Sequence, residues 1–268
     1  MPRIMANGIE LYYELHGPPD GDVLVLSNGV LMSTASWVYQ TPVLSRHYRL
    51  LLYDCRGMWQ SEHPPGPYSM ELHADDLATL LDALGIERAH VGGISYGAEI
   101  SMIFALKYPE KTRSLILSSA VSQVDRMLRG VMESWIAAVE AKDPEMFFRV
   151  SYPTNFSEAW IAANQEALDL ARERYEMLDY DAFLELLLSF SRLGVTDDLH
   201  EIEAPTLVIV GEEDILKPRK YAEIIARKIR NTEFAVVPHA GHAVLWERPG
   251  VFNSLILGFL AKQGRAEC

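Results

Sequence analysis

The chain has 268 residues, 49% of them hydrophobic, and a formal net charge of −13. This composition is typical of a globular protein with a sizeable core, built as one domain or as one domain with an insertion. The negative charge and the absence of a Lys/Arg block argue against nucleic-acid or anionic-membrane partners. No stretch approaches 18 apolar residues, and two cysteines, Cys55 and Cys268, cannot form a disulfide framework. We therefore expect a cytoplasmic protein, a monomer or homodimer.

In chain order, the hydrophobic pattern predicts alternating strands and helices. Residues 9–15 alternate between apolar and other side chains, which indicates a half-buried antiparallel edge strand. Continuous apolar runs predict strands covered on both faces. The predicted strands are 23–26, 48–53, 89–94, 115–117, 205–210 and 234–237, and the predicted helices are a stretch reaching residue 44, then 70–84 closed by Gly85, 96–108, 218–229 and a closing helix through 260. This alternation predicts a mostly parallel sheet with helices on both faces.

Residues 121–195 break the pattern, because they contain no strand signal. Helices are expected at 126–141, 145–150, 157–178 and 181–193, rich in large apolar side chains. A helical insertion between two strands of a parallel sheet is typical of a cap over the carboxyl ends of the strands, where such sheets bind ligands. We therefore expect a core made of residues 1–120 and 196–268 and a cap at 121–195.

The run Gly93-Ile94-Ser95-Tyr96-Gly97 lies between a predicted strand and a predicted helix. Gly-x-Ser-x-Gly in this context is the nucleophile elbow of a serine hydrolase. The serine stands on a strained turn, and the chain passes so close that the residues two positions before and after it must be glycine. Ser95 is therefore the predicted nucleophile.

A serine hydroxyl needs a base within hydrogen-bond reach, and that base needs an acid to orient it. Asp214 and His242 follow the strands 205–210 and 234–237, so both are expected at the sheet edge that carries Ser95. Gly241 favours His242 over His239, since it would let the loop approach the elbow. Rival acids are Glu212, Glu213 and Asp125. The His239-x-x-His242 pair lacks a third ligand, so no metal and no cofactor are expected.

An oxyanion intermediate needs two N–H donors. One is expected from Tyr96, the residue after the nucleophile, and the other from Val30, after the turn at Asn28-Gly29. A plain turn at Asn28-Gly29 is the alternative. Aromatic residues of the cap and of the loop after residue 54 are candidates for an apolar substrate pocket, and we name three: Trp59, Trp135 and Trp160.

With these motifs in view, the chain resembles the α/β-hydrolase superfamily. The resemblance is carried by the elbow and by four further motifs: Asn28-Gly29 with Trp37, Asp54-x-Arg56-Gly57, Gly211-x-x-Asp214-x-x-x-Pro218, and Gly241-His242 with Glu247-x-Pro249. It implies an eight-stranded fold, a Ser95–His242–Asp214 triad, and structural roles for Asp54 and Arg56. The Ser27-Asn28 start resembles 3-oxoadipate enol-lactone hydrolases and related esterases and lactonases.

Two positions depart from the superfamily pattern. Trp59 replaces a frequent glycine and could present its indole to the pocket. Glu99, one helical turn beyond Ser95, either meets a buried polar group or lies exposed.

The resulting prediction is a serine hydrolase that cleaves a carboxylic ester or lactone through an acyl-enzyme. Alternatives on the same triad are C–C bond hydrolysis, cofactor-free perhydrolysis, or a hydrolase-derived ligand sensor. If the substrate carries a carboxylate, a cap arginine should bind it, with the candidates Arg126, Arg129, Arg149 and Arg192.

Overall fold

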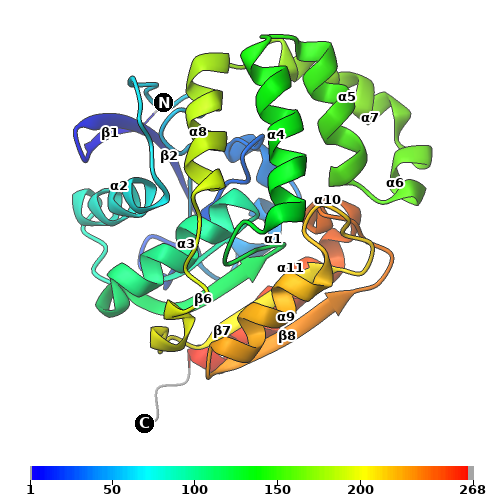
Figure 1. The fold of residues 1–268 in the computed structure, drawn as a ribbon. Coiled ribbons are helices and arrows are strands. Elements are labelled where there is room, and N and C mark those ends of the chain that lie inside the picture. The colour runs from blue at the N-terminus through cyan, green and yellow to red at the C-terminus, as the bar shows by residue number, and fades with distance from the viewer. Residues whose placement is uncertain (1, 265–268) are drawn as a thin grey trace.

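The computed structural model describes residues 2–264, so Cys268 lies outside the described residues. Eight strands form one sheet in the order β1-β2-β4-β3-β5-β6-β7-β8, in which the β1–β2 and β2–β4 pairs are antiparallel and the other pairs are parallel (Figure 1). The expected α/β class and eight-stranded sheet are therefore confirmed. The strands are β1 Arg3–Ala6, β2 Ile9–His16, β3 Val23–Ser27, β4 Arg49–Tyr53, β5 Ala89–Ile94, β6 Thr112–Ser118, β7 Thr206–Gly211 and β8 Thr232–Val237.

Helices cover both faces of the sheet, because alternate residues of each parallel strand point to opposite sides. Val25 packs toward α2 and α3, whereas Leu24 and Leu26 pack toward α1 and α11. The helices outside the β6–β7 connection are α1 Thr41–Leu44, α2 Met70–Ala83, α3 Tyr96–Lys107, α9 Arg219–Lys228, α10 Val244–Glu247 and α11 Pro249–Gln263. Among residues 2–264, no helix is both long and apolar enough to span a membrane.

The ends of α2 illustrate how the sequence sets local structure. Ser69 precedes the helix in an extended conformation, and its Oγ accepts a hydrogen bond from Leu72 N at 3.0 Å. At the other end Gly85 has a φ of +68°, and the amide of Ile86 donates back to Leu81 O at 2.8 Å. This left-handed glycine ends the helix, as its position in the sequence predicts.

The connection between β6 and β7 carries five helices: α4 Arg126–Glu140, α5 Pro144–Asn155, α6 Glu158–Ala163, α7 Gln165–Tyr175 and α8 Tyr180–Ser191. Figure 1 shows them gathered at one end of the sheet, and we call this group of helices the cap. The predicted single helix at 157–178 is wrong, since the helix breaks at Asn164, with φ −131° and ψ +43°. The Asn164 side chain donates to Trp160 O at 2.8 Å and so satisfies a carbonyl at the end of α6.

Two further expectations near the N-terminus need correction. The antiparallel strand β2 is second from the edge, because the short strand β1, which was not predicted, pairs outside it. The helical stretch before residue 44 is a 3₁₀ turn, Thr34–Trp37, followed by α1. Pro42 stands in the first turn of α1, where its missing N–H costs nothing, but it cannot continue a preceding helix.

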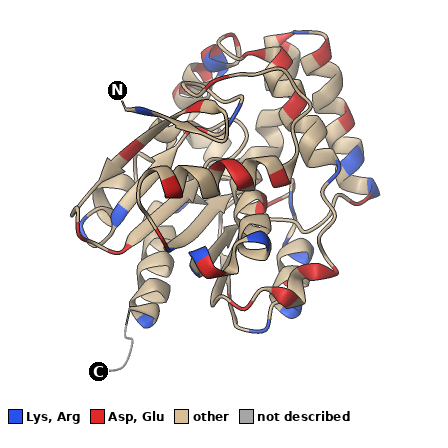
Figure 2. Cartoon of the chain, turned by 90° about the vertical axis from the view of Figure 1, so that its left-hand side faces the viewer, with Lys and Arg blue, Asp and Glu red and all other residues tan. Residues whose placement is uncertain are grey.

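Charged residues of both signs are mixed on the side of the molecule that Figure 2 shows. Figure 2 shows Asp and Glu interspersed with Lys and Arg over the visible face, without a continuous basic block. This distribution agrees with the scattered charges along the sequence.

Candidate active site

Ser95 occupies the sharp turn between β5 and α3. Its backbone has φ +53° and ψ −122°, and its amide donates to Ser118 O at 2.8 Å. A β-carbon at Gly93 would lie 2.5 Å from the carbonyl carbon of Gly97, and one at Gly97 would overlap the Ser27 carbonyl. The two glycines therefore have the steric role predicted from the sequence. This strained backbone presents the Ser95 side chain at the cavity described below.

Asp214 and His242 lie next to one another at the ends of β7 and β8. His242 Nδ1 and Asp214 Oδ2 are 2.9 Å apart, and both side chains are buried. The other Asp214 oxygen accepts a hydrogen bond from the amide of Lys217 at 2.8 Å. The carboxylate can therefore fix the orientation and tautomer of the imidazole, leaving Nε2 for chemistry.

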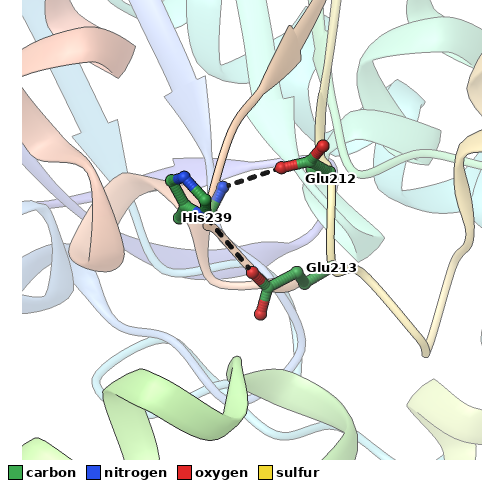
Figure 3. Close-up of side chains that lie close together, drawn as sticks. All are labelled: Glu212, Glu213 and His239. Carbon is green, nitrogen blue, oxygen red and sulfur yellow. Dashed lines mark hydrogen bonds and ion pairs between the residues drawn. The ribbon is translucent and has the colours of Figure 1, made fainter.

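The rival base and acids have other roles. His239 is exposed; its amide donates to Glu212 at 3.2 Å, and its ring lies 3.7 Å from Glu213 (Figure 3). These three residues are also the one group of at least three His, Cys, Asp or Glu side chains, among residues 2–264, that is clustered tightly enough to hold a metal ion. All three are exposed, and the contacts among them are those of a surface ion pair. Asp125 caps α4 through Leu128 N at 2.9 Å.

Buried polar groups hold the loop that carries His242. Ser119, itself at φ +49°, donates from Oγ to His242 O at 3.0 Å. Glu247 accepts from Gly241 N at 3.0 Å and from Ser157 Oγ at 2.5 Å, so it joins this loop to the cap. A β-carbon at Gly241 would lie 2.5 Å from Ser157 N. The predicted reason for Gly241 is therefore wrong, since its close neighbour is the cap segment before α6 and not the elbow.

A cavity of about 650 Å³ lies between the sheet edge and the cap. Ser95, Tyr96 and His242 are on its wall, together with Val30 from the loop after β3. The three predicted tryptophans, Trp59, Trp135 and Trp160, also line it. Most of the remaining lining is apolar, as is usual for a site that binds a small molecule.

Comparisons with known proteins agree with this architecture. The family model for the alpha/beta hydrolase fold matches residues 22–145. A protein of Azorhizobium caulinodans named "Putative carbamate hydrolase RutD" is 32% identical over 263 residues, covering 97% of this chain and 98% of the relative. The chain belongs to the α/β-hydrolase family.

Solved structures of α/β-hydrolases superpose over almost the whole chain. A thermophilic esterase from Thermogutta terrifontis is 28% identical, with a TM-score of 0.90 over 99% of this chain and 100% of the esterase. The enol-lactonase from Burkholderia xenovorans LB400 has a TM-score of 0.92 over 97% of this chain and 100% of its own, at 24% identity, which is a likeness of fold alone. The protein is therefore a hydrolase of this fold.

In this α/β-hydrolase the loop after β3 is firmly anchored. Asn28 Oδ1 accepts from Trp37 Nε1 at 2.7 Å, and its Nδ2 donates to Asp54 at 3.1 Å. Asp54 also accepts from the amides of Thr34 and Gln60. Burial raises the pKa of Asp54 to about 6 in spite of these donors. The predicted structural role of Asp54 agrees with these contacts, and Arg56 forms a buried ion pair with Asp76 at 2.7 Å.

The side chain of Tyr96 is held by His73, a histidine that no sequence motif singles out. The Tyr96 hydroxyl lies 2.8 Å from His73 Nε2, and both side chains are buried. Burial lowers the pKa of His73 to about 3, with a smaller contribution from Arg56, so the imidazole is neutral. The contact restrains the residue whose amide is a candidate oxyanion donor.

Glu99 is fully buried, which settles the choice that the sequence left open. Both of its carboxylate oxygens lie 2.9 Å from Lys217 Nζ, and one accepts from Val121 N. Burial raises the pKa of Glu99, and Lys217 opposes that shift. Lys217 lines the cavity, yet no periodic pattern marks it, because it lies on the loop between β7 and α9.

The four cap arginines considered as carboxylate ligands do not line the cavity. All are exposed; Arg149 pairs with Glu145, and Arg192 donates to Tyr68 O. The arginine on the cavity wall is Arg174, on α7. Sequence periodicity missed it, because the break at Asn164 resets which face of the following helix points inward.

Proposed function

We propose that this protein is a serine hydrolase that cleaves a carboxylic ester or lactone through an acyl-enzyme. Ser95 Oγ attacks the carbonyl carbon, while His242 Nε2 takes the serine proton and then passes it to the leaving alkoxide. Asp214 holds the imidazole, and the amides of Val30 and Tyr96 bind the oxyanion. Water then attacks the acyl-enzyme with the same base. The supporting observation is the buried 2.9 Å contact between Asp214 and His242 on a cavity that Ser95 also lines.

The test is pre-steady-state hydrolysis of p-nitrophenyl hexanoate. We expect a burst of nitrophenol that matches the enzyme concentration, followed by turnover. Ser95→Ala should abolish the burst and lower kcat by about 10⁴-fold or more. Ser134→Ala removes an exposed hydroxyl on α4 and should change neither the burst nor kcat. Unchanged turnover in Ser95→Ala would exclude the proposal.

Carbamate hydrolysis is a second candidate, favoured by the name of the relative from Azorhizobium caulinodans. A carbamate presents the same carbonyl carbon to Ser95, but it has two possible leaving groups. If the C–N bond breaks, His242 must protonate the nitrogen as it leaves; if the C–O bond breaks, the alcohol leaves and water hydrolyses a carbamoyl-enzyme. Comparing kcat/KM for p-nitrophenyl hexanoate and a p-nitrophenyl carbamate, which share a leaving group, beside an aliphatic lactone, would separate the two. If the carbamate is turned over repeatedly and its kcat/KM exceeds those of the ester and the lactone, carbamate hydrolysis would be favoured over ester or lactone cleavage.

A further inference from the structure

The cavity wall holds positive charge but no carboxylate. Among the residues that line it within 2–264, the basic side chains other than His242 are Lys217 and Arg174, and none is Asp or Glu. Lys217 is neutralised, since both oxygens of the buried Glu99 lie 2.9 Å from its Nζ. Arg174 is different, because its guanidinium forms no ion pair with an Asp or Glu of residues 2–264, although the negative charge of Asp54 acts on it.

Arg174 is held in place by direct contacts with neutral side chains. Its guanidinium carbon lies 4.3 Å from the centroid of the Trp59 ring, and its Nη2 donates to Ser33 Oγ at 3.2 Å. Burial lowers the pKa of Arg174, and the negative charge of Asp54 acts in the opposite direction. A half-buried guanidinium of this kind has several N–H donors left for a ligand.

Trp59 is in a conformation that a bulky side chain rarely adopts. Its φ is +43°, in the left-handed region that favours glycine. The chain that follows Trp59 is fixed through Asp54, whose carboxylate accepts from Gln60 N at 3.1 Å and whose carbonyl accepts from Ser61 Oγ at 2.5 Å. A strained tryptophan where glycine would be relaxed needs a compensating role. Here the indole lines the cavity and supports the guanidinium of Arg174.

We propose that Arg174, stacked on Trp59, is an anion subsite that binds a carboxylate carried by the substrate. This inference rests on the proposed function and narrows it to acid-bearing esters or lactones. A guanidinium pairs with a carboxylate through two parallel hydrogen bonds, which gives orientation as well as affinity. The apolar wall would receive the carbon chain between the carboxylate and the carbonyl at Ser95. Lys217 is not expected to bind the substrate carboxylate, because its ammonium group is already paired with Glu99.

The experiment compares matched acidic and neutral esters in the full-length protein. The first set pairs the p-nitrophenyl hydrogen esters of adipate, suberate and sebacate with p-nitrophenyl hexanoate, octanoate and decanoate, respectively. The second set is 4-carboxyphenyl hexanoate against phenyl hexanoate, which moves the acid to the leaving group. We expect the wild type to prefer the acidic member of at least one pair. In Arg174→Met, KM for that acidic ester should rise about 10-fold or more, while the neutral ester changes less than about 2-fold.

Two further variants separate the subsite from a structural role. Arg172→Met removes an exposed arginine of the same helix, paired with Glu145, and should leave both esters unchanged. Trp59→Gly relieves the backbone strain and removes the stack, so it should lower the preference for the acidic ester without unfolding the protein. An equal loss on acidic and neutral esters in Arg174→Met, or no preference in the wild type for any pair, would overturn the subsite.

A binding measurement keeps this inference distinct from the proposed function. Calorimetric titration with hexanoate and with hexanamide needs no turnover. Hydrolysis of neutral esters with no Arg174-dependent acid preference would retain the serine hydrolase and reject the subsite. No hydrolysis of any ester, together with hexanoate binding that Arg174→Met abolishes, would reject the ester hydrolase and retain an anion site. Equal binding of hexanoate by wild type and Arg174→Met would reject the subsite.

Discussion

The sheet edge and the cap form the same cavity, but the sheet edge is constrained by close backbone packing and hydrogen bonds, whereas the cap is less tightly constrained. At the sheet edge, Gly93 and Gly97 allow one backbone path, and hydrogen bonds with Asp214 and Ser119 hold His242. In the cap, a β-carbon added at Gly130 of α4 would meet nothing within 4 Å, and the cavity wall is mostly apolar. The edge therefore tolerates almost no change, whereas the cap can vary its lining and so its choice of substrate.

The largest expected effect is at the edge, with Asp214→Asn. The amide cannot hold the required imidazole tautomer, so kcat for a neutral aryl ester should fall by about 10⁴-fold while the fold is retained. The neighbouring exposed carboxylate gives a matched control, Glu213→Gln, which should stay within about 2-fold of the wild type. Steady-state kinetics of the wild type, Asp214→Asn and Glu213→Gln measure these changes in kcat. Comparable losses in both variants would mean that the Asp214–His242 contact is not what drives activity.

Paired glycine substitutions test the contrast in backbone freedom. Gly97→Ala places a methyl group against the Ser27 carbonyl and should lower the free energy of unfolding by about 3 kcal/mol or more. Gly130→Ala lies on an exposed helical surface and should raise it by about 0.5–1 kcal/mol. Urea unfolding measures both. If Gly97→Ala unfolded at the wild-type midpoint, the steric account of the elbow would be wrong.

Glu247 is where the two regions meet, so its removal should loosen one against the other. In Glu247→Gln an amide nitrogen would replace an oxygen that accepts from Ser157 or Gly241. The N–H groups of that amide would then face a buried donor that has lost its acceptor. We expect a loss of stability of about 1–3 kcal/mol and a fall in kcat larger than the rise in KM, because the His242 loop loses its anchor. Unfolding curves and steady-state kinetics of the variant measure the two effects.

An exposed pair provides the control for that variant. Glu233→Gln removes a carboxylate that contacts Lys262 at the surface, and it should change neither stability nor kcat measurably. If Glu247→Gln changed the free energy of unfolding and kcat as little as Glu233→Gln does, the contacts of Glu247 between the cap and the His242 loop would not contribute to stability or activity.

The last expected effect is absent at neutral pH and develops only in acid, and it belongs to the core. Burial, and to a lesser degree Arg113, lowers the pKa of His90 to about 4, whereas an unfolded histidine titrates near a pKa of about 6.5. As pH falls between these values the unfolded chain binds the proton first, so stability is lost. His90→Asn can keep the contact to Ser114 and should reduce this slope by up to about 1.4 kcal/mol per pH unit.

Urea unfolding at several pH values from about 7 down to about 4 would measure the slope for wild type and His90→Asn. The exposed His47, changed to Asn in the same way, is the matched control. An identical slope in wild type and His90→Asn would contradict the assignment to His90.

Much of the sheet edge could be predicted from the sequence, since strands and their following loops recur in a fixed order. Ser95, Asp214 and His242 each follow a parallel strand, and the carboxyl ends of such strands share one edge. The cap was harder to predict. Its helical content was evident, but the break at Asn164 and the residues facing the cavity were not, because periodicity gives a helix an apolar face without saying what that face meets.

The amino-acid pattern alone was enough to indicate the α/β-hydrolase fold, the strained turn at Ser95 and the glycines that permit it, because these depend on local sterics and on strand order. Which charges reach the cavity depended on how the helices pack. Arg174 and Lys217 line it and four other arginines do not, since helix rotation and burial fix these positions through contacts distant in sequence. For the same reason Glu99 could be placed in the core only once Lys217 was found beside it.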